Sequence, residues 1–172
     1  MRKRIKLLTI GSQRAGKSTL IKRYCEDRFF GNYLPTIGID FGMKPIQMNN
    51  LDIRIDFFDT SGNDVYFEIR NEFYKDINGV ILVYDVSNRR SFKYLSHALQ
   101  EYHEIIGSYS TEIPIVLCAN KTDKKPRQVS ENEGNDFASS NNLLYFECSS
   151  KNGRNVSKLF QSLIENCLET IG

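Results

Sequence analysis

Gly11-Ser12-Gln13-Arg14-Ala15-Gly16-Lys17-Ser18 is the stretch that decides the fold. It follows the short apolar run Ile5–Ile10, which is typical of a buried strand, and it leads into a helical pattern over Ser18–Asp27. In that context the spacing G-x-x-x-x-G-K-S predicts a loop that wraps a phosphate. The glycines permit the tight backbone turn, and successive N–H groups then point inward at the N-terminus of the helix.

Two side chains in this stretch carry the chemistry that a nucleoside triphosphate requires. Lys17 brings a positive charge to the outer phosphates, and the Ser18 hydroxyl is a hard oxygen ligand that suits Mg²⁺. A simple glycine turn between a strand and a helix is the alternative, which the complete spacing disfavours. The motif does not indicate which base is bound. The residues predicted to bind the nucleotide here are Gly11, Arg14, Ala15, Gly16, Lys17, Ser18 and Thr19.

Strand and helix patterns alternate along the whole chain. Asn49-Asn50 is a predicted hairpin turn, and the continuous apolar run Gly79–Asp85 is typical of a central parallel strand covered on both faces. The alternation predicts one α/β domain over residues 1–172, with a mostly parallel six-stranded sheet, one antiparallel strand and helices on both faces. The other strands are predicted over Phe41–Met48, Leu51–Phe58, Ile113–Ala119 and Leu143–Cys148, and the other helices over Ser91–Ile106 and Asn155–Leu168.

The base is indicated by the loop Asn120-Lys121-Thr122-Asp123, which follows a predicted strand. Functional loops of an open α/β sheet lie at the carboxyl ends of its strands. The Asp123 carboxylate can accept hydrogen bonds from N1–H and the 2-amino group of guanine, a donor pair that adenine lacks. Asn120 can tie loops together, and the Lys121 stem can lie over the purine. Alone, this tetrapeptide would read as a solvated loop; with Ser149-Ser150-Lys151 after the next strand it favours guanine.

Composition and charge narrow the class of protein. The chain has 172 residues, of which 40% are hydrophobic and 26% charged, and its net charge is +2. These values are ordinary for one globular domain, and they give no strong electrostatic case for nucleic acid as a partner. No apolar stretch approaches the ~20 residues that span a bilayer. The four cysteines, Cys25, Cys118, Cys148 and Cys167, form no C-x-x-C pair, and each lies inside an otherwise apolar segment. We therefore expect reduced thiols in a cytoplasmic protein.

Five segments together resemble the guanine-nucleotide motifs of Ras-superfamily GTPases in order and spacing, over essentially the whole chain. Within that superfamily Thr36–Phe41 resembles the Rab branch. Ile21–Glu26 and Arg70–Asp76 are similar to a narrower group of Rab-like proteins that in some organisms carry a C-terminal J domain. No His-Pro-Asp signature occurs here, so we expect no J domain. The five segments are Gly11–Ser18, Pro35–Gly38, Asp59–Gly62, Asn120–Asp123 and Ser149–Lys151.

The resemblance implies the P-loop GTPase fold, with GTP, GDP and Mg²⁺ as ligands. It implies that Ser18 and Thr36 coordinate Mg²⁺ directly and that Asp59 does so through water. Effector proteins would bind a monomer through residues 30–41 and 60–76, the two switch regions; exchange factors and activating proteins are the other implied partners. Further nucleotide contacts are implied for Phe29, Tyr33, Thr36, Gly62, Asn120, Lys121, Asp123, Ser149, Ser150 and Lys151.

Two positions depart from the family pattern and predict slow GTP hydrolysis. Asn63 stands where the family has the glutamine that orients the attacking water, and its amide is one methylene shorter. Gln13 stands where the phosphate loop usually has a small residue, close to the expected γ-phosphate. The alternative is a GTP-loaded scaffold with negligible hydrolysis. Gln13 could also supply the missing amide, or Arg14 a charge, although a solvent-facing Arg14 is favoured.

The C-terminus departs from the Rab pattern as well. The chain ends Glu169-Thr170-Ile171-Gly172, and Cys167 does not fit a C-a-a-X prenylation signal. Met1-Arg2 excludes N-myristoylation. We therefore expect no membrane anchor in this chain, and we interpret Cys167 as a thiol on the apolar face of the last helix.

Overall fold

The computed structural model describes residues 2–107 and 112–172, and within them six strands form one sheet. The strand order is β2-β3-β1-β4-β5-β6; β2 is antiparallel to β3, and the other neighbours pair in parallel. This confirms the predicted mostly parallel sheet with one antiparallel strand. The strands are β1 (Arg2–Ile10), β2 (Ile39–Met48), β3 (Leu51–Thr60), β4 (Gly79–Asp85), β5 (Ile115–Asn120) and β6 (Leu144–Glu147).

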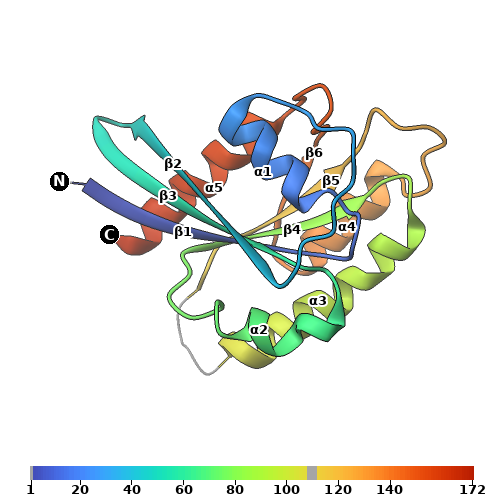
Figure 1. Cartoon of the computed structure of the whole chain (residues 1–172), viewed down its shortest axis with the longest axis horizontal. Coiled ribbons are helices and arrows are strands. Elements are labelled where there is room, and N and C mark those ends of the chain that lie inside the picture. Colours follow the sequence, from blue (N-terminus) through green and yellow to red (C-terminus); the bar gives the residue numbers. More distant parts are fainter. Residues whose placement is uncertain (1, 108–111) are drawn as a thin grey trace.

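Helices cover both faces of the sheet, as predicted. Figure 1 shows α1 and α5 on one side of the sheet and α2 and α3 on the other. Within residues 2–107 and 112–172, no helix combines the length and apolarity needed to cross a bilayer. The helices are α1 (Lys17–Glu26), α2 (Phe67–Asn71), α3 (Arg89–Ile106), α4 (Glu131–Ser140) and α5 (Val156–Ile171), with a 3₁₀ turn, η1, over Asp64–Tyr66.

Two hydrophobic cores, one on each face, hold these layers together. Successive side chains of a strand point to opposite faces, so Ile5 and Leu7 of β1 pack beneath α1 and α5, whereas Leu8 and Ile10 pack beneath α3 and α4. A central strand buried on both faces needs apolar residues at every position, and all seven residues of β4 are buried. The apolar runs in the sequence follow directly from this arrangement.

Helix α4 was not among the sequence predictions. Its ten residues carry few apolar side chains, so the apolar period of a helix is weak. Local capping defines its start: Ser130 Oγ accepts the backbone N–H of Glu133 at 3.2 Å, and the Glu133 carboxylate accepts the Ser130 N–H at 2.9 Å. Such a capping box satisfies two N–H groups that the first turn of a helix leaves free.

The four cysteines are free thiols, as expected. Cys118, Cys148 and Cys167 are buried, and Cys25 is half-buried. Burial raises the pKa of the Cys167 thiol to about 12, so it stays protonated on the core face of α5. The interpretation of Cys167 as a packed thiol is confirmed.

Candidate functional site

The phosphate loop is shaped by the close approach of its backbone to neighbouring strands. Gly11 has a φ of 144°, and a Cβ atom there would lie 2.3 Å from the carbonyl oxygen of Val83 in β4. Gly16, with a φ of 98°, ends the loop immediately before α1 begins at Lys17. Only glycine has room at position 11 and adopts this positive φ without strain. Thr19 donates its hydroxyl to the Gly16 carbonyl at 3.0 Å, so it closes the first turn of the helix.

The Lys17 ammonium group lies inside this loop. Its Nζ donates to the carbonyl oxygens of Gly11 at 3.0 Å and Ser12 at 2.8 Å, and the residue is only 6% exposed. Burial lowers the pKa of Lys17 to about 8, although the nearby Asp59 carboxylate opposes that shift. A buried cation that is this poorly compensated favours an anion beside it. The loop is therefore suited to a phosphate.

The three predicted metal ligands meet at one point. The Ser18 hydroxyl lies 3.1 Å from the Thr36 hydroxyl and hydrogen-bonds to the Asp59 carboxylate. Thr9 donates to the other Asp59 oxygen at 3.1 Å and so orients that carboxylate. Burial raises the pKa of Asp59, whereas Ser18 and Lys17 oppose the shift. Two hydroxyls and one carboxylate form the hard oxygen set that Mg²⁺ prefers, so these residues fit that ion.

Asn120 ties the phosphate loop to the loop after β6, as predicted. Its side-chain nitrogen donates to the carbonyl oxygens of Ala15 at 3.3 Å and Gly16 at 3.4 Å. Its side-chain oxygen accepts from Ser150, from the backbone N–H at 3.2 Å and from the hydroxyl at 3.1 Å. One buried amide therefore fixes loops that lie more than one hundred residues apart in sequence.

The predicted base-reading residues lie beside this amide. The Asp123 carboxylate is exposed and accepts the hydroxyl of Ser149 at 2.6 Å. The Lys121 ammonium donates to the Arg14 carbonyl at 2.5 Å and pairs with Asp85 at 2.9 Å. Its side chain therefore extends from the loop after β5 to the phosphate loop. Lys151, in the loop between β6 and α5, is exposed. The carboxylate is thus oriented by a hydroxyl and open toward a ligand.

Phe29 and Tyr33 lie on the segment between α1 and β2 and have large exposed fractions, 42% and 45%; Tyr33 belongs to the expected first switch region. The guanidinium carbon of Arg14 lies 4.6 Å from the centre of the Tyr33 ring. Arg14 is exposed, as the sequence favoured, but it stacks on an aromatic ring instead of pointing freely into solvent. This contact joins the phosphate loop to the first switch region.

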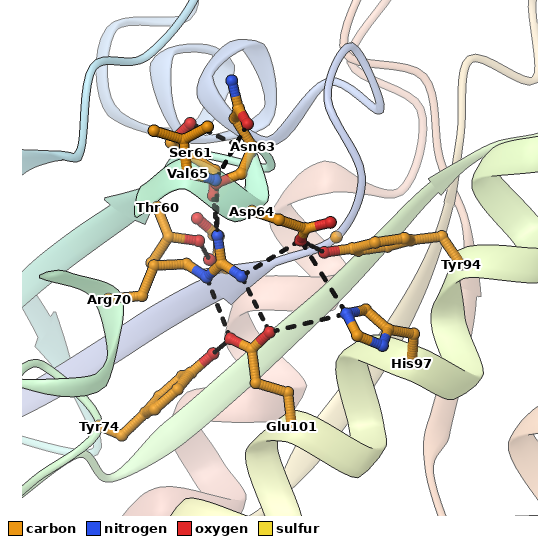
Figure 2. A network of polar contacts seen from close by, with 12 residues as sticks. Thr60, Ser61, Asn63, Asp64, Val65, Arg70, Tyr74, Tyr94, His97 and Glu101 are labelled. Atoms are coloured by element: carbon orange, nitrogen blue, oxygen red, sulfur yellow. Dashed lines mark hydrogen bonds and ion pairs between the residues drawn. The ribbon is translucent and has the colours of Figure 1, made fainter. Parts of the chain in front are cut away.

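Gly62 packs directly on the phosphate loop. A Cβ atom on Gly62 would lie 2.3 Å from the backbone nitrogen of Gln13 and 2.7 Å from the Gly11 carbonyl oxygen. The Gln13 side chain itself is exposed. Asn63 uses its side-chain oxygen locally, because it accepts the backbone N–H of Val65 at 3.1 Å and caps η1 (Figure 2). The amide at the position where the family has its water-orienting glutamine is thus turned back onto its own chain.

Sequence reasoning missed Arg70 and Glu101. Arg70 of α2 is 3% exposed, Glu101 of α3 is 5% exposed, and two hydrogen bonds join them (Figure 2). The available signal was Glu101 itself, a charge between Leu99 and Tyr102 on the apolar face of a helix. Tyr74 is buried and also donates to Glu101.

Comparison with known proteins agrees with this geometry. Relatives named "DnaJ homolog subfamily C member 27" are 44% identical over 171 residues in Rattus norvegicus, 45% over 162 in Gallus gallus and 43% over 171 in Homo sapiens. These matches cover 95%, 92% and 95% of this chain, but only 63%, 59% and 63% of the relatives. The resemblance to the Rab-like group that carries a J domain elsewhere is confirmed. A sequence model described as Ras family matches residues 6–169, and the chain therefore belongs to the Ras family of guanine-nucleotide-binding switch proteins.

Proposed function

We propose that this chain is a molecular switch that binds GTP and GDP with Mg²⁺ and hydrolyses GTP slowly. One observation carries the proposal: the Lys17 ammonium, the Ser18–Thr36–Asp59 oxygen set and the Asp123 loop lie at the same edge of the sheet. This arrangement supplies a charge for phosphate, ligands for a metal and an acceptor for guanine. We propose that all of residues 1–172 form one monomeric, cytoplasmic GTPase domain.

Each part of the site has a definite task in this proposal. Lys17 and the loop N–H groups bind the phosphates, and Ser18 and Thr36 hold Mg²⁺ directly, with Asp59 acting through water. When bound there, Mg²⁺ would supply positive charge to the phosphate oxygens. Asp123, oriented by Ser149, accepts hydrogen bonds from N1–H and the 2-amino group of guanine. The remaining nucleotide contacts are proposed for Gly11, Arg14, Ala15, Gly16, Thr19, Phe29, Tyr33, Gly62, Asn120, Lys121, Ser150 and Lys151.

The switch itself consists of two segments that respond to the γ-phosphate. Thr36 lies against Ser18, and Gly62 lies against the phosphate loop, so both positions can report whether that phosphate is present. The surrounding surface is unusually apolar: Leu34, Ile37 and Val65 are 78%, 79% and 81% exposed. Exposed apolar groups at this density favour a protein partner, so we propose that effectors bind residues 30–41 and 60–76.

Slow hydrolysis is supported by the position of Asn63. In phosphoryl transfer the protein contributes mainly by positioning, so a misplaced amide costs rate and not affinity. The Asn63 oxygen is engaged with Val65, and its side chain is too short to reach outward without breaking that bond. The same observation favours a second candidate, a GTP-loaded scaffold with negligible hydrolysis. Single-turnover hydrolysis separates the two, because the scaffold gives no measurable rate even with an activating protein.

The base assignment is tested by Asp123→Asn. The substitution converts two acceptor oxygens into one acceptor and one donor, which suits xanthine better than guanine. We expect the variant to lose GTP affinity and to gain xanthosine triphosphate affinity, measured by competition against a fluorescent nucleotide. Lys124→Gln, an exposed neighbour, is the matched control and should keep the parent's preference. An unchanged preference in Asp123→Asn would remove this carboxylate from the base site.

A further inference from the structure

A buried ion pair joins the second switch region to helix α3. Arg70 Nε donates to Glu101 Oε1 at 3.0 Å, and an Nη donates to Oε2 at 2.8 Å, so the two planar groups face each other in a bidentate pair. Both side chains are 4% exposed. The hydroxyl of Tyr74 donates to Oε1 at 2.9 Å and completes the environment of the carboxylate.

The remaining donors of Arg70 hold the turn that carries Gly62. Its other Nη donates to the carbonyl oxygen of Asn63 at 2.8 Å and to that of Ser61 at 3.3 Å. These two carbonyls lie on either side of Gly62 in the chain. Figure 2 shows the guanidinium between this turn and Glu101. Because Gly62 lies on the phosphate loop, Arg70 fixes the backbone that would meet the γ-phosphate.

The hydrogen bonds of Arg70 couple the position of the Ser61–Asn63 turn to that of α3. Burial alone would lower the pKa of Arg70, but the hydrogen bonds and charge of Glu101 raise it, so the guanidinium is charged. The buried Arg70 guanidinium donates four hydrogen bonds, so it cannot move without leaving a carboxylate or a carbonyl oxygen unpaired. The turn and α3 therefore move together or not at all.

The same residues do not suit a metal. Ligand atoms of Asp64, His97 and Glu101 lie within 4.8 Å of one another. The Arg70 guanidinium, however, lies 2.8 Å from Glu101 and 3.6 Å from Asp64, so a cation is already present at this point. The close approach of Asp64 and Glu101 is therefore explained by the charge of Arg70 between them.

We propose that Arg70 is a positioning residue that couples the Ser61–Asn63 turn to α3, with Glu101 as its anchor. The inference rests on the proposed function. Coupling is reciprocal, so GTP in the site must also change α3, and a partner bound to the exposed face of α3 must change the preference for GTP over GDP.

The test is the ratio of affinities for a non-hydrolysable GTP analogue and for GDP. Arg70→Lys keeps the charge but loses the planar fork, so it cannot hold Glu101 and both carbonyls together. We expect the analogue to bind at least about fivefold more weakly relative to GDP. Arg127→Lys is the matched control, since Arg127 also grips a buried carboxylate, Glu147, with two donors, but contacts neither switch region in the described structure. It should lower thermal stability and leave the ratio unchanged.

A second measurement needs no variant. In the parent, exchange of GDP for the GTP analogue should slow hydrogen exchange of backbone amides in residues 94–101 of α3, and leave residues 131–140 of α4 unchanged. An unchanged affinity ratio in Arg70→Lys, or α3 exchange that ignores the nucleotide, would show that the pair is merely structural. Failure of the parent to bind either nucleotide would instead refute the proposed function.

Discussion

Lengthening residue 63 by one methylene is the change with the clearest consequence for rate. In the parent, Oδ1 of Asn63 accepts the Val65 N–H at 3.1 Å, a short local ring that asparagine closes readily. Glutamine is one methylene too long for the same ring. Asn63→Gln should therefore release the amide toward the attacking water, while Arg70 still holds the carbonyl of residue 63.

The size of the effect follows from two contributions. A capping hydrogen bond of this kind is worth about 1 kcal/mol, and Asn63 would have to break it before its amide could turn outward. The additional C–C bond then carries the amide about 1.5 Å further. Together these predict that Asn63→Gln hydrolyses GTP about ten-fold faster, or about 1.4 kcal/mol of barrier. Gln13 lies on the phosphate loop against Gly62 and can occupy the space that the longer amide needs. The double variant Asn63→Gln with Gln13→Gly should therefore hydrolyse GTP faster than Asn63→Gln alone.

The assay is single-turnover hydrolysis of preloaded GTP by the parent, Asn63→Gln, Gln13→Gly and the double variant. Asn63→Ala is the control: if the asparagine amide is committed to η1, its removal changes the rate by no more than about threefold. A parent as fast as the double variant would refute the reasoning. So would a loss of about 100-fold in Asn63→Ala, because Asn63 would then be a competent catalytic residue.

Arg14→Ala should speed release of fluorescent GDP by about threefold, since an exposed cation–π contact with Tyr33 is worth ~0.5–1 kcal/mol; an unchanged release rate would contradict a role for this contact in holding the nucleotide. Glu133 has its pKa lowered from 4.5 to about 2 by Arg89 and the Ser130 cap, so its contribution to stability is present above pH 4.5 and is lost as pH falls toward 2. In denaturant titrations Glu133→Gln should flatten the pH dependence of unfolding in that window. Ser18→Asn should weaken GTP more than GDP in Mg²⁺ titrations, and equal losses would contradict its role as a metal ligand.

The sheet and its functional edge are predictable because burial leaves a direct pattern in sequence. A strand covered on both faces is apolar along its length, as in Val80–Tyr84, and glycines mark the loop where backbones come closest. Once the strand order is known, the loops that hold Lys17, Asp59 and Asn120 must lie at one edge. The predicted phosphate and metal residues therefore meet as expected.

The features that the sequence did not predict depend on the orientation of a side chain or on contacts between residues far apart in the chain. The length of Asn63 is visible in the sequence, but the bond that turns its amide toward Val65 is not. Arg70 and Glu101 are 31 residues apart, and although Glu101 stands out as a charge on an apolar helix face, the sequence does not indicate its partner. Helix α4 was missed because its apolar period is weak, although Ser130 and Glu133 form a capping box at its start.

The most direct test of the central claim is the identity of the nucleotide that remains bound when the protein is purified without added nucleotide. The protein is denatured, and the released compounds are separated by chromatography and quantified against protein. A guanine-nucleotide switch with slow hydrolysis should release guanine nucleotide in near-equimolar amount, with GTP beside GDP. Release of adenine nucleotides, or of no nucleotide from a protein that also fails to bind added GTP and GDP, would contradict the account.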